Sequence, residues 1–285
     1  MLLGDRGVLD RMPDEPFLKL IYRANTGKKL HLDPPVTFNE KIQWLKLHFR
    51  KPEFPAMADK YRVRAYLAKK APNLPMIPLL GVWDDPGEID FSALPARFVL
   101  KCTHDSGSVL ICRDKECFDT DSAVKYLRAR LKKNYFAPGR EWPYKDAEPR
   151  VIAEEYVEDP ASQVLRVYKI LNFDGEPRII QMINNDKTKN ETINYYDTDW
   201  KRLPFRQNFP NGTTDDPRPE GLATMLENAK LLADGFPFLR TDFYEVAGKV
   251  IFSEFTFFSD SGIALFDPPE WDTTLGSWIT LPQAK

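Results

Sequence analysis

The chain has 285 residues, of which 42% are hydrophobic and 29% charged, a composition that excludes a disordered, collagen-like or low-complexity protein. Forty basic residues against 42 acidic ones leave a formal charge of −2, so no overall positive field favours a nucleic acid or an anionic membrane surface. The sequence opens without a signal-peptide pattern and contains no apolar run long enough for a membrane span. We therefore expect a folded cytoplasmic protein with no nucleic-acid partner and no integral membrane segment.

Residues 1–70 are expected to form a helical N-terminal segment. The apolar spacing within Phe17–Arg23 predicts a first helix. Thr37 and Glu40 form an S/T-x-x-E capping box, which predicts that a second helix begins directly after the threonine. A third helix is predicted over Lys60–Lys70, ahead of a proline.

Residues 71–150 change to short β-like runs and are expected to form a central α+β subdomain. Strands are predicted over Met76–Val82, Phe98–Cys102 and Val109–Cys112, and a helix over Asp121–Lys133.

Residues 151–285 are expected to form a C-terminal subdomain that ends in a hairpin. Its strands are predicted over Val151–Val157, Val164–Phe173, Pro177–Asn184, Phe238–Val246 and Val250–Phe258, and its helix over Leu222–Leu232. Asp174-Gly175 predicts a tight turn between two of these strands, whereas the polar stretch Lys187–Pro219 is expected to be irregular. Because helices and strands alternate without a regular βαβ rhythm, the pattern favours an α+β fold with mostly antiparallel sheets.

The final hairpin carries acidic side chains that could hold a metal ion. If Ala247–Lys249 is a three-residue turn, Asp242 lies opposite Glu254 and Arg240 lies opposite Thr256, on one face of the hairpin. Two facing carboxylates repel each other unless a cation lies between them, and Mg²⁺ suits such a pair. On this hypothesis, changing either acid to its amide leaves stability unchanged or raises it. The alternatives are that Arg240 and nearby lysines neutralise the acids, or that a two-residue turn shifts the register.

Lys101 ends an apolar strand and is followed by the small, polar loop Thr103–Ser108. A lysine beside a loop rich in backbone N–H groups is a candidate phosphate clamp, although strand-end lysines are more often simply solvated. No Walker A pattern accompanies it.

A second candidate for nucleotide binding is the run Glu154, Glu155, Tyr156 and Val157, which closes an apolar strand and could present its backbone to an adenine edge. The alternative is an edge strand with its acids in solvent. Lys169 lies inside a predicted strand, where a cation needs a partner or a ligand. Pairing with one of these two glutamates would also explain it.

The sequence Asp197-Thr198-Asp199 matches the short DxD pattern of many glycosyltransferases. Three residues in a polar loop match such a pattern easily by chance. A glycosyltransferase nevertheless stands as an alternative function, and it predicts binding of a sugar nucleotide without ATP turnover.

In chain order, these features resemble the layout of ATP-grasp enzymes. More specifically, the chain resembles the TupA-like ATP-grasp family, which is associated with bacterial surface polysaccharide and teichuronopeptide synthesis. The residues that carry the resemblance are the run Phe38–Leu47 (FNEKIQWLKL), Asp59–Tyr61, Lys101 with His104–Gly107, Tyr168–Lys169 with Phe173–Gly175, Arg240–Tyr244 and Glu254–Phe257. Together they extend over nearly the whole chain.

The resemblance implies an α+β ATP-grasp fold with an N-terminal helical extension, and ATP held between two α+β layers. The nucleotide-binding residues that it implies are Lys101, Ser106, Gly107, Glu154, Glu155, Tyr156, Val157 and Lys169. The residues implied to hold Mg²⁺ are Asp242, Glu254 and Thr256, and those implied to be catalytic are Arg240 and Lys169.

The activity that the resemblance implies is ATP-dependent ligation of a carboxylate to an amine through an acyl phosphate. The expected carboxylate is a uronic acid or an amino acid of a bacterial glycan or its precursor. Peripheral association with polysaccharide biosynthesis machinery is a further expectation.

Three residues depart from the family pattern. Asp105 replaces a glycine of the loop, Val167 replaces an acid, and Thr256 stands where an asparagine is usual. A charge at Asp105 is expected to weaken nucleotide binding. These departures support a third hypothesis, a non-catalytic carbohydrate-binding or partner-binding module that keeps the fold.

Overall fold

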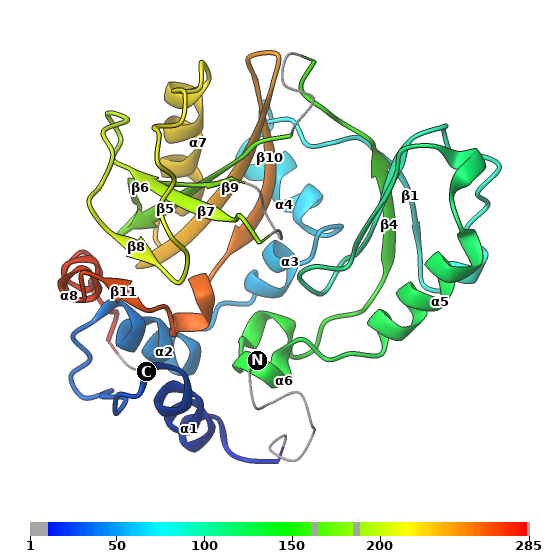
Figure 1. Cartoon of the computed structure of the whole chain (residues 1–285). Coiled ribbons are helices and arrows are strands. Elements are labelled where there is room, and N and C mark those ends of the chain that lie inside the picture. Colours follow the sequence, from blue (N-terminus) through cyan, green and yellow to red (C-terminus); the bar gives the residue numbers. More distant parts are fainter. Residues whose placement is uncertain (1–10, 161–164, 185–188, 284–285) are drawn as a thin grey trace.

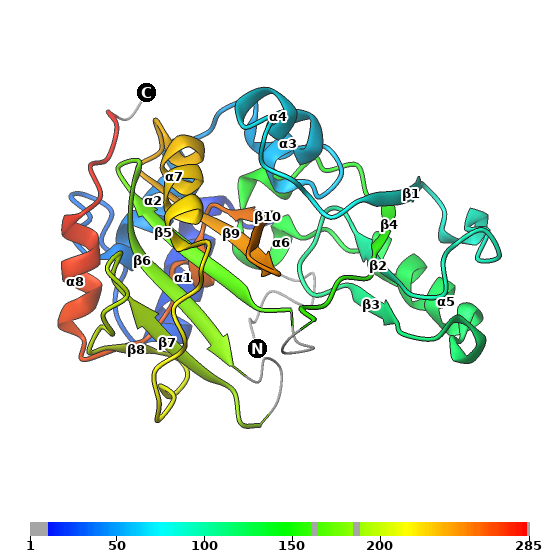
Figure 2. The same ribbon diagram turned by 90° about the horizontal axis from the view of Figure 1, so that it is seen from above.

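The computed structural model of the chain describes residues 11–160, 165–184 and 189–283, which fold into two lobes (Figure 1). Each lobe is built on one antiparallel sheet, and Figure 2 shows the two sheets side by side with α3 and α4 between them at one edge. The expectation of an α+β fold with mostly antiparallel sheets is confirmed. Among the described residues, no helix is both long enough and apolar enough to cross a membrane.

The N-terminal region is helical, as predicted. Its helices are α1 (Asp14–Thr26), α2 (Phe38–His48), α3 (Phe54–Ala58) and α4 (Val63–Lys70). The capping box at the start of α2 is present: the Thr37 side chain accepts from the Glu40 backbone, and the Glu40 carboxylate accepts from the Thr37 backbone. The predicted third helix begins three residues late, because the Asp59 carboxylate accepts backbone hydrogen bonds from Tyr61 and Arg62 in a turn ahead of it.

The smaller sheet has the strand order β1-β4-β2-β3. Its strands are β1 (Leu79–Trp83), β2 (Phe98–Cys102), β3 (Val109–Cys112) and β4 (Val151–Glu155). Helix α5 (Thr120–Leu131) packs on it and contributes Leu127 to the core formed with Leu100 and Val151. The short helix α6 (Phe136–Gly139) then leads back toward β4.

The larger sheet has the order β10-β9-β5-β6-β7. Its strands are β5 (Val167–Phe173), β6 (Glu176–Asn184), β7 (Thr192–Tyr196), β9 (Phe238–Val246) and β10 (Lys249–Thr256). Helix α7 (Leu222–Ala233) packs on β5, β6 and β9. The chain is completed by β8 (Arg206–Gln207), β11 (Phe266–Asp267) and α8 (Glu270–Ser277). The core under this sheet also takes in α2 and α3 through Phe38 and Phe54.

Of two predictions about this part of the chain, one is confirmed and the other is wrong in part. Asp174-Gly175 forms the predicted tight turn, with φ of 50° and 80° at its two residues. The prediction that Lys187–Pro219 is irregular is wrong in part, because this stretch contains β7 and β8. Tyr195 and Tyr196 of β7 are almost completely buried, and burial of their rings outweighs the polar character of the segment. Val164 and residues 187–188, which belong to predicted segments, lie outside the described residues.

The hairpin β9–β10 pairs Asp242 with Glu254 as predicted, but its turn differs from the predicted one. Its turn has two residues, Ala247 and Gly248, with φ of 48° and 74°, so the predicted three-residue turn is wrong. The resulting shift in register is undone by a β-bulge between Phe252 and Glu254. Asp242 therefore lies opposite Glu254, and Arg240 lies opposite Thr256 farther along the same pair of strands.

Candidate functional site

A cavity of about 290 Å³ lies between the smaller sheet and the end of β9, and we call it the hinge cavity. It is lined by the predicted nucleotide-binding residues Lys101, Glu154, Glu155, Tyr156 and Val157, with Val99, Ile111 and Tyr244. Strand β4 ends at Glu155, so Tyr156 and Val157 line the cavity from a segment that has left the sheet. A cavity with apolar walls, and with backbone groups beyond the end of β4, suits a flat ring that has polar atoms at its edge.

Lys101 and Glu154 form an ion pair inside this cavity. The Lys101 Nζ lies 2.6 Å from one Glu154 oxygen, and the Arg64 guanidinium lies 2.5 Å from the other. Burial opposes the charge of Lys101, but Tyr244 and Glu154 raise the pKa of its ammonium overall. Pairing of Lys169 with Glu154 or Glu155 was one alternative for that lysine, whereas the observed partners of Glu154 come from β2 and α4.

A second cavity of about 480 Å³, which we call the chamber, lies against the larger sheet. It is lined by Lys169, Arg240, Glu254 and Thr256 of the predicted site and by Ser106 of the loop. Gly107 is not among the lining residues of either cavity, and its φ of 86° serves the turn of the loop.

The charged residues of the chamber sit on adjacent strands. Lys169 of β5 lies beside Asp242 of β9, which lies beside Glu254 of β10. Arg240 binds both Asp242 oxygens at 2.8 Å and approaches Glu254 at 3.5 Å. The Asp242 side chain is 1% exposed and that of Glu254 is 41% exposed, so only Glu254 opens widely to the chamber.

The two acids respond differently to this environment. Burial raises the pKa of Asp242, although Arg240 and Lys169 oppose it. Burial acts in the same direction on Glu254, but there the cations Lys60 and Arg240 prevail and lower its pKa. Burial, followed by the charge of Arg240, lowers the pKa of Lys169. The arrangement favours a metal ion at Glu254 and an anion near Lys169.

Asp105 is among the residues that line the chamber, but its side chain is only 1% exposed. Its carboxylate is buried and accepts hydrogen bonds from Arg130 of α5 at 2.8 and 2.5 Å and from the Ser108 hydroxyl. Lys60 donates to the Asp105 carbonyl from the other side. The residue thus braces the loop and pairs its charge with Arg130, and its effect on nucleotide binding stays a prediction.

The chamber also contains residues that the sequence analysis missed. They are Lys60, Tyr135, Glu141, Tyr144, Asp260 and Ser261. Lys60 belonged to a quoted motif, but none of the others lies in a recognisable pattern. Asp260 and Ser261 have φ of 47° and 52°, a left-handed conformation that is unusual for such residues.

The DxD residues lie elsewhere. Asp197 uses one oxygen to accept backbone hydrogen bonds from Asp199 and Lys201, as in an ordinary turn. The Asp199 side chain is 76% exposed. Within the described residues, no group of three or more histidine, cysteine, aspartate or glutamate side chains is arranged for a metal ion.

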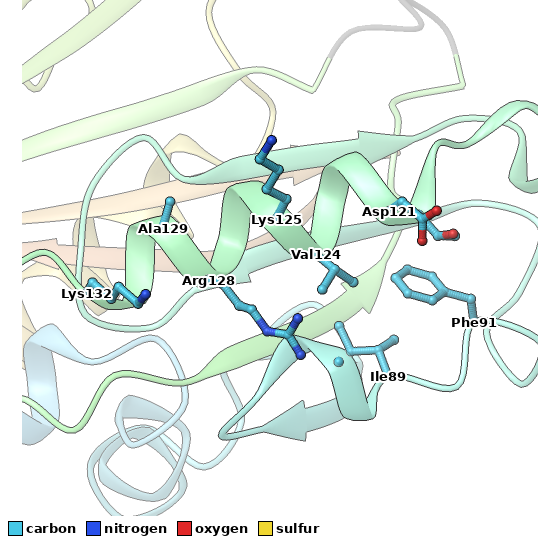
Figure 3. Close-up of a pocket in the computed structure, with 10 residues that line it drawn as sticks. Ile89, Phe91, Asp121, Val124, Lys125, Arg128, Ala129 and Lys132 are labelled. Atoms are coloured by element: carbon cyan, nitrogen blue, oxygen red, sulfur yellow. The ribbon is translucent and has the colours of Figure 1, made fainter.

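A hollow of about 850 Å³ runs along α5 on the outer side of the smaller lobe (Figure 3). Val124, Lys125 and Arg128 line it from the helix, and Ile89 and Phe91 lie near Val124 and Arg128. Arg128 is already paired with Asp85. The hollow contains none of the predicted site residues and is not the candidate active site.

Comparison with known proteins adds family information to this geometry. A family model described as TupA-like ATPgrasp matches residues 40–280. No curated protein matches the sequence.

Solved structures with similar folds include three ligases or synthetases. A D-alanine–D-alanine ligase from Bacillus anthracis complexed with ATP is 14% identical, with 78% of this chain and 58% of that chain covered and a TM-score of 0.42. D-cycloserine synthetase DcsG is 18% identical, with 72% and 64% covered and a TM-score of 0.40. The ATP-grasp ligase PsnB, complexed with minimal precursor, Mg and ADP, is 14% identical, with 76% and 57% covered and a TM-score of 0.39. The chain thus spans less than two thirds of the length of each.

Proposed function

The chain belongs to the TupA-like ATP-grasp family, and from this premise we propose that it joins a carboxylate to an amine at the expense of ATP. The fold is the ATP-grasp fold, in which two α+β lobes enclose the site. The observation that carries the proposal is the chamber. It brings Lys169, Arg240 and Glu254 from three adjacent strands to one cavity wall, beside a second cavity formed by the predicted adenine-binding segment.

The hinge cavity is the proposed site of the adenine ring. Tyr156 and Val157 offer backbone groups at its edge, and Val99 and Ile111 supply apolar walls. Lys101 points a paired ammonium into the same cavity and would bind phosphate oxygens where the nucleotide leaves it. Ser106, from the braced loop, reaches the chamber from the same lobe.

The side chains present fit Mg²⁺. Glu254 is half exposed to the chamber, and Asp242 lies directly across the hairpin. Mg²⁺ is usually bound by one or two carboxylates together with substrate phosphates and water, which is the donor set available here. Arg240 occupies both Asp242 oxygens, but each carboxylate oxygen has a further lone pair. Glu254 would therefore be the principal ligand, Asp242 the second, and Thr256 a weak third. When bound, the ion would neutralise phosphate charge during transfer.

The remaining residues are proposed to act on the reacting groups. Lys169 and Arg240 lie beside the two acids and would stabilise negative charge on the transferred phosphoryl group and on the acyl phosphate. Arg240 presents a planar guanidinium, held rigidly by Asp242, which suits contact with two oxygens at once. The amine then displaces phosphate and forms the amide.

The substrate class follows from the family alone. We propose a uronic acid or an amino acid of a bacterial surface polysaccharide, or of its precursor, as the carboxylate. Association with the polysaccharide biosynthesis machinery belongs to the same proposal.

Calorimetric titration with Mg·ATP, Mg·ADP and a UDP-sugar tests the nucleotide. We expect adenine nucleotides to bind and the UDP-sugar not to bind. Binding of the UDP-sugar alone would favour a glycosyltransferase, and binding of neither would favour a non-catalytic module.

ADP release is then measured with a panel of uronic and amino acids, in wild type, Glu254→Gln and the matched control Glu176→Gln. Glu176 belongs to the same sheet but pairs with Lys230 at the exposed surface. Only Glu254→Gln should lose turnover.

A further inference from the structure

The FNEKIQWLKL run of α2 contains polar side chains that are fully buried. Asn39, Gln43 and Lys46 are 2%, 1% and 1% exposed and recur at helical spacing on one face. All three donate hydrogen bonds to backbone carbonyls of residues 261–264, which follow β10. This face of α2 therefore holds the segment that contains the left-handed Asp260 and Ser261.

Lys46 connects this segment to the other side of the chamber. Its three N–H groups have three acceptors: the Gly139 carbonyl at 2.8 Å, the Ser261 carbonyl at 2.9 Å and the Ser261 Oγ at 2.8 Å. Gly139 ends α6, so this hydrogen bond joins α2 to α6. One buried ammonium thus fixes two segments that both line the chamber.

Ser261 lies between Lys46 and Glu141. Because its oxygen accepts from Lys46, its hydrogen can be directed at the neighbouring Glu141 carboxylate, and the Ser261 hydroxyl favours the charged form of that carboxylate. Both oxygens lie against Gly139, since a Cβ there would be 2.7 Å from the Ser261 Oγ and 3.1 Å from a Glu141 oxygen, so one of these groups would have to move. Glu141 itself lines the chamber together with Lys169 and Arg240.

We propose that Lys46 and Ser261 are positioning residues that hold the Glu141 carboxylate in the chamber, where it accepts a proton from the attacking amine. The inference rests on the proposed function, because an amine must enter the chamber as an ammonium and lose a proton before it attacks. The ammonium gives one proton to Glu141, and the neutral nitrogen bonds to the acyl carbon. The carbon–oxygen bond to phosphate breaks, and phosphate takes the second proton.

The environment of Glu141 agrees with this role. Burial raises the pKa of its carboxyl, while Lys46 and the Ser261 hydroxyl oppose this. A base whose pKa is raised toward neutrality transfers protons more effectively than an ordinary carboxylate. Together with Arg240, these two neighbours favour its charged form.

A titration without substrate tests the positioning. Carboxyl-labelled glutamate is followed by ¹³C NMR, and the Glu141 signal is assigned from Glu141→Gln. The midpoint of this signal should move upward in Ser261→Ala and in Lys46→Met, because each removes an interaction that favours the charged carboxylate. Lys41→Met is the matched control, since Lys41 is on the same helix but donates to the Ile279 carbonyl, away from the residues of the chamber. An unmoved midpoint in Ser261→Ala, which keeps the buried ammonium, would overturn the proposal.

A comparison of two nucleophiles tests the proton transfer. Hydroxylamine is mostly neutral at pH 7, whereas methylamine is an ammonium, and glucuronate with Mg·ATP serves as the acid. Glu141→Gln should lose product formation with methylamine by about 100-fold or more and keep the hydroxamate reaction. Equal losses with both nucleophiles would refute the role of Glu141 as a base. A wild type that binds no Mg·ADP would instead contradict the proposed function, and the titration would still decide the positioning.

Discussion

The contrast between Asp242→Asn and Glu254→Gln tests the electrostatics of the hairpin. From the sequence, both acids were expected to repel each other, so that either amide would be neutral or stabilising. The structure reverses this expectation for Asp242, because Arg240 already lies between the two acids. Asp242 accepts two hydrogen bonds of 2.8 Å and is 1% exposed, whereas Glu254 has one approach at 3.5 Å and is 41% exposed.

The magnitudes follow from burial. Removing one partner of a buried ion pair costs about 3–5 kcal/mol, and the amide oxygen of asparagine keeps one of the two hydrogen bonds. We therefore expect Asp242→Asn to lower the free energy of unfolding by about 3 kcal/mol. The exposed, long contact of Glu254 predicts a loss of about 0–1 kcal/mol for Glu254→Gln.

Urea denaturation at pH 7.5, followed by circular dichroism and tryptophan fluorescence, measures both values. The same titration in Mg·ADP at about 100 times its Kd should stabilise wild type by about 2.7 kcal/mol and stabilise both variants much less. If Asp242→Asn is as stable as wild type, or more stable, the ion pair with Arg240 does not stabilise the fold and our account of the site is wrong.

Three further predictions concern the guanidinium of Arg240, the two DxD aspartates and the ammonium of Lys46. Arg240→Lys keeps the charge but loses the planar fork, so we expect Mg·ADP affinity within about threefold of wild type by calorimetry and a large loss of turnover; weakened binding with normal turnover would contradict this. Asp197→Asn combined with Asp199→Asn should leave turnover and Mg²⁺ response unchanged, and loss of all metal-dependent activity would disprove our assignment. Burial lowers the pKa of Lys46 to about 8. Because the unfolded chain then holds a proton that the folded chain has lost, wild type should gain about 3 kcal/mol of stability relative to Lys46→Met between pH 8 and 10.5. A flat difference over this range would show that the Lys46 ammonium is not destabilised by burial.

Local patterns determined several parts of this protein. The capping box at Thr37 fixed the start of α2, because a cap is satisfied within four residues. The turn at Asp174-Gly175 followed in the same way from the backbone freedom of its two residues. The family resemblance, borne by the order of short motifs, is confirmed over residues 40–280.

The facing of Asp242 and Glu254 was predicted correctly for a reason that the structure corrects. Strand periodicity put the two acids on one face, but neither the two-residue turn nor the bulge could be distinguished from a three-residue turn. Both geometries give the same pairing at this position, because a bulge adds the one residue that the shorter turn removes.

Only the tertiary structure decided which charges meet. Glu154 pairs with Arg64 and Lys101, and Lys46 reaches Gly139 across more than ninety intervening positions of the sequence. Motifs specify residue types and local spacing, whereas the partner of a buried charge depends on which segments the core brings together. A buried ion needs such partners to offset its lost hydration, so these contacts are among the strongest requirements of the fold and the least visible in the sequence.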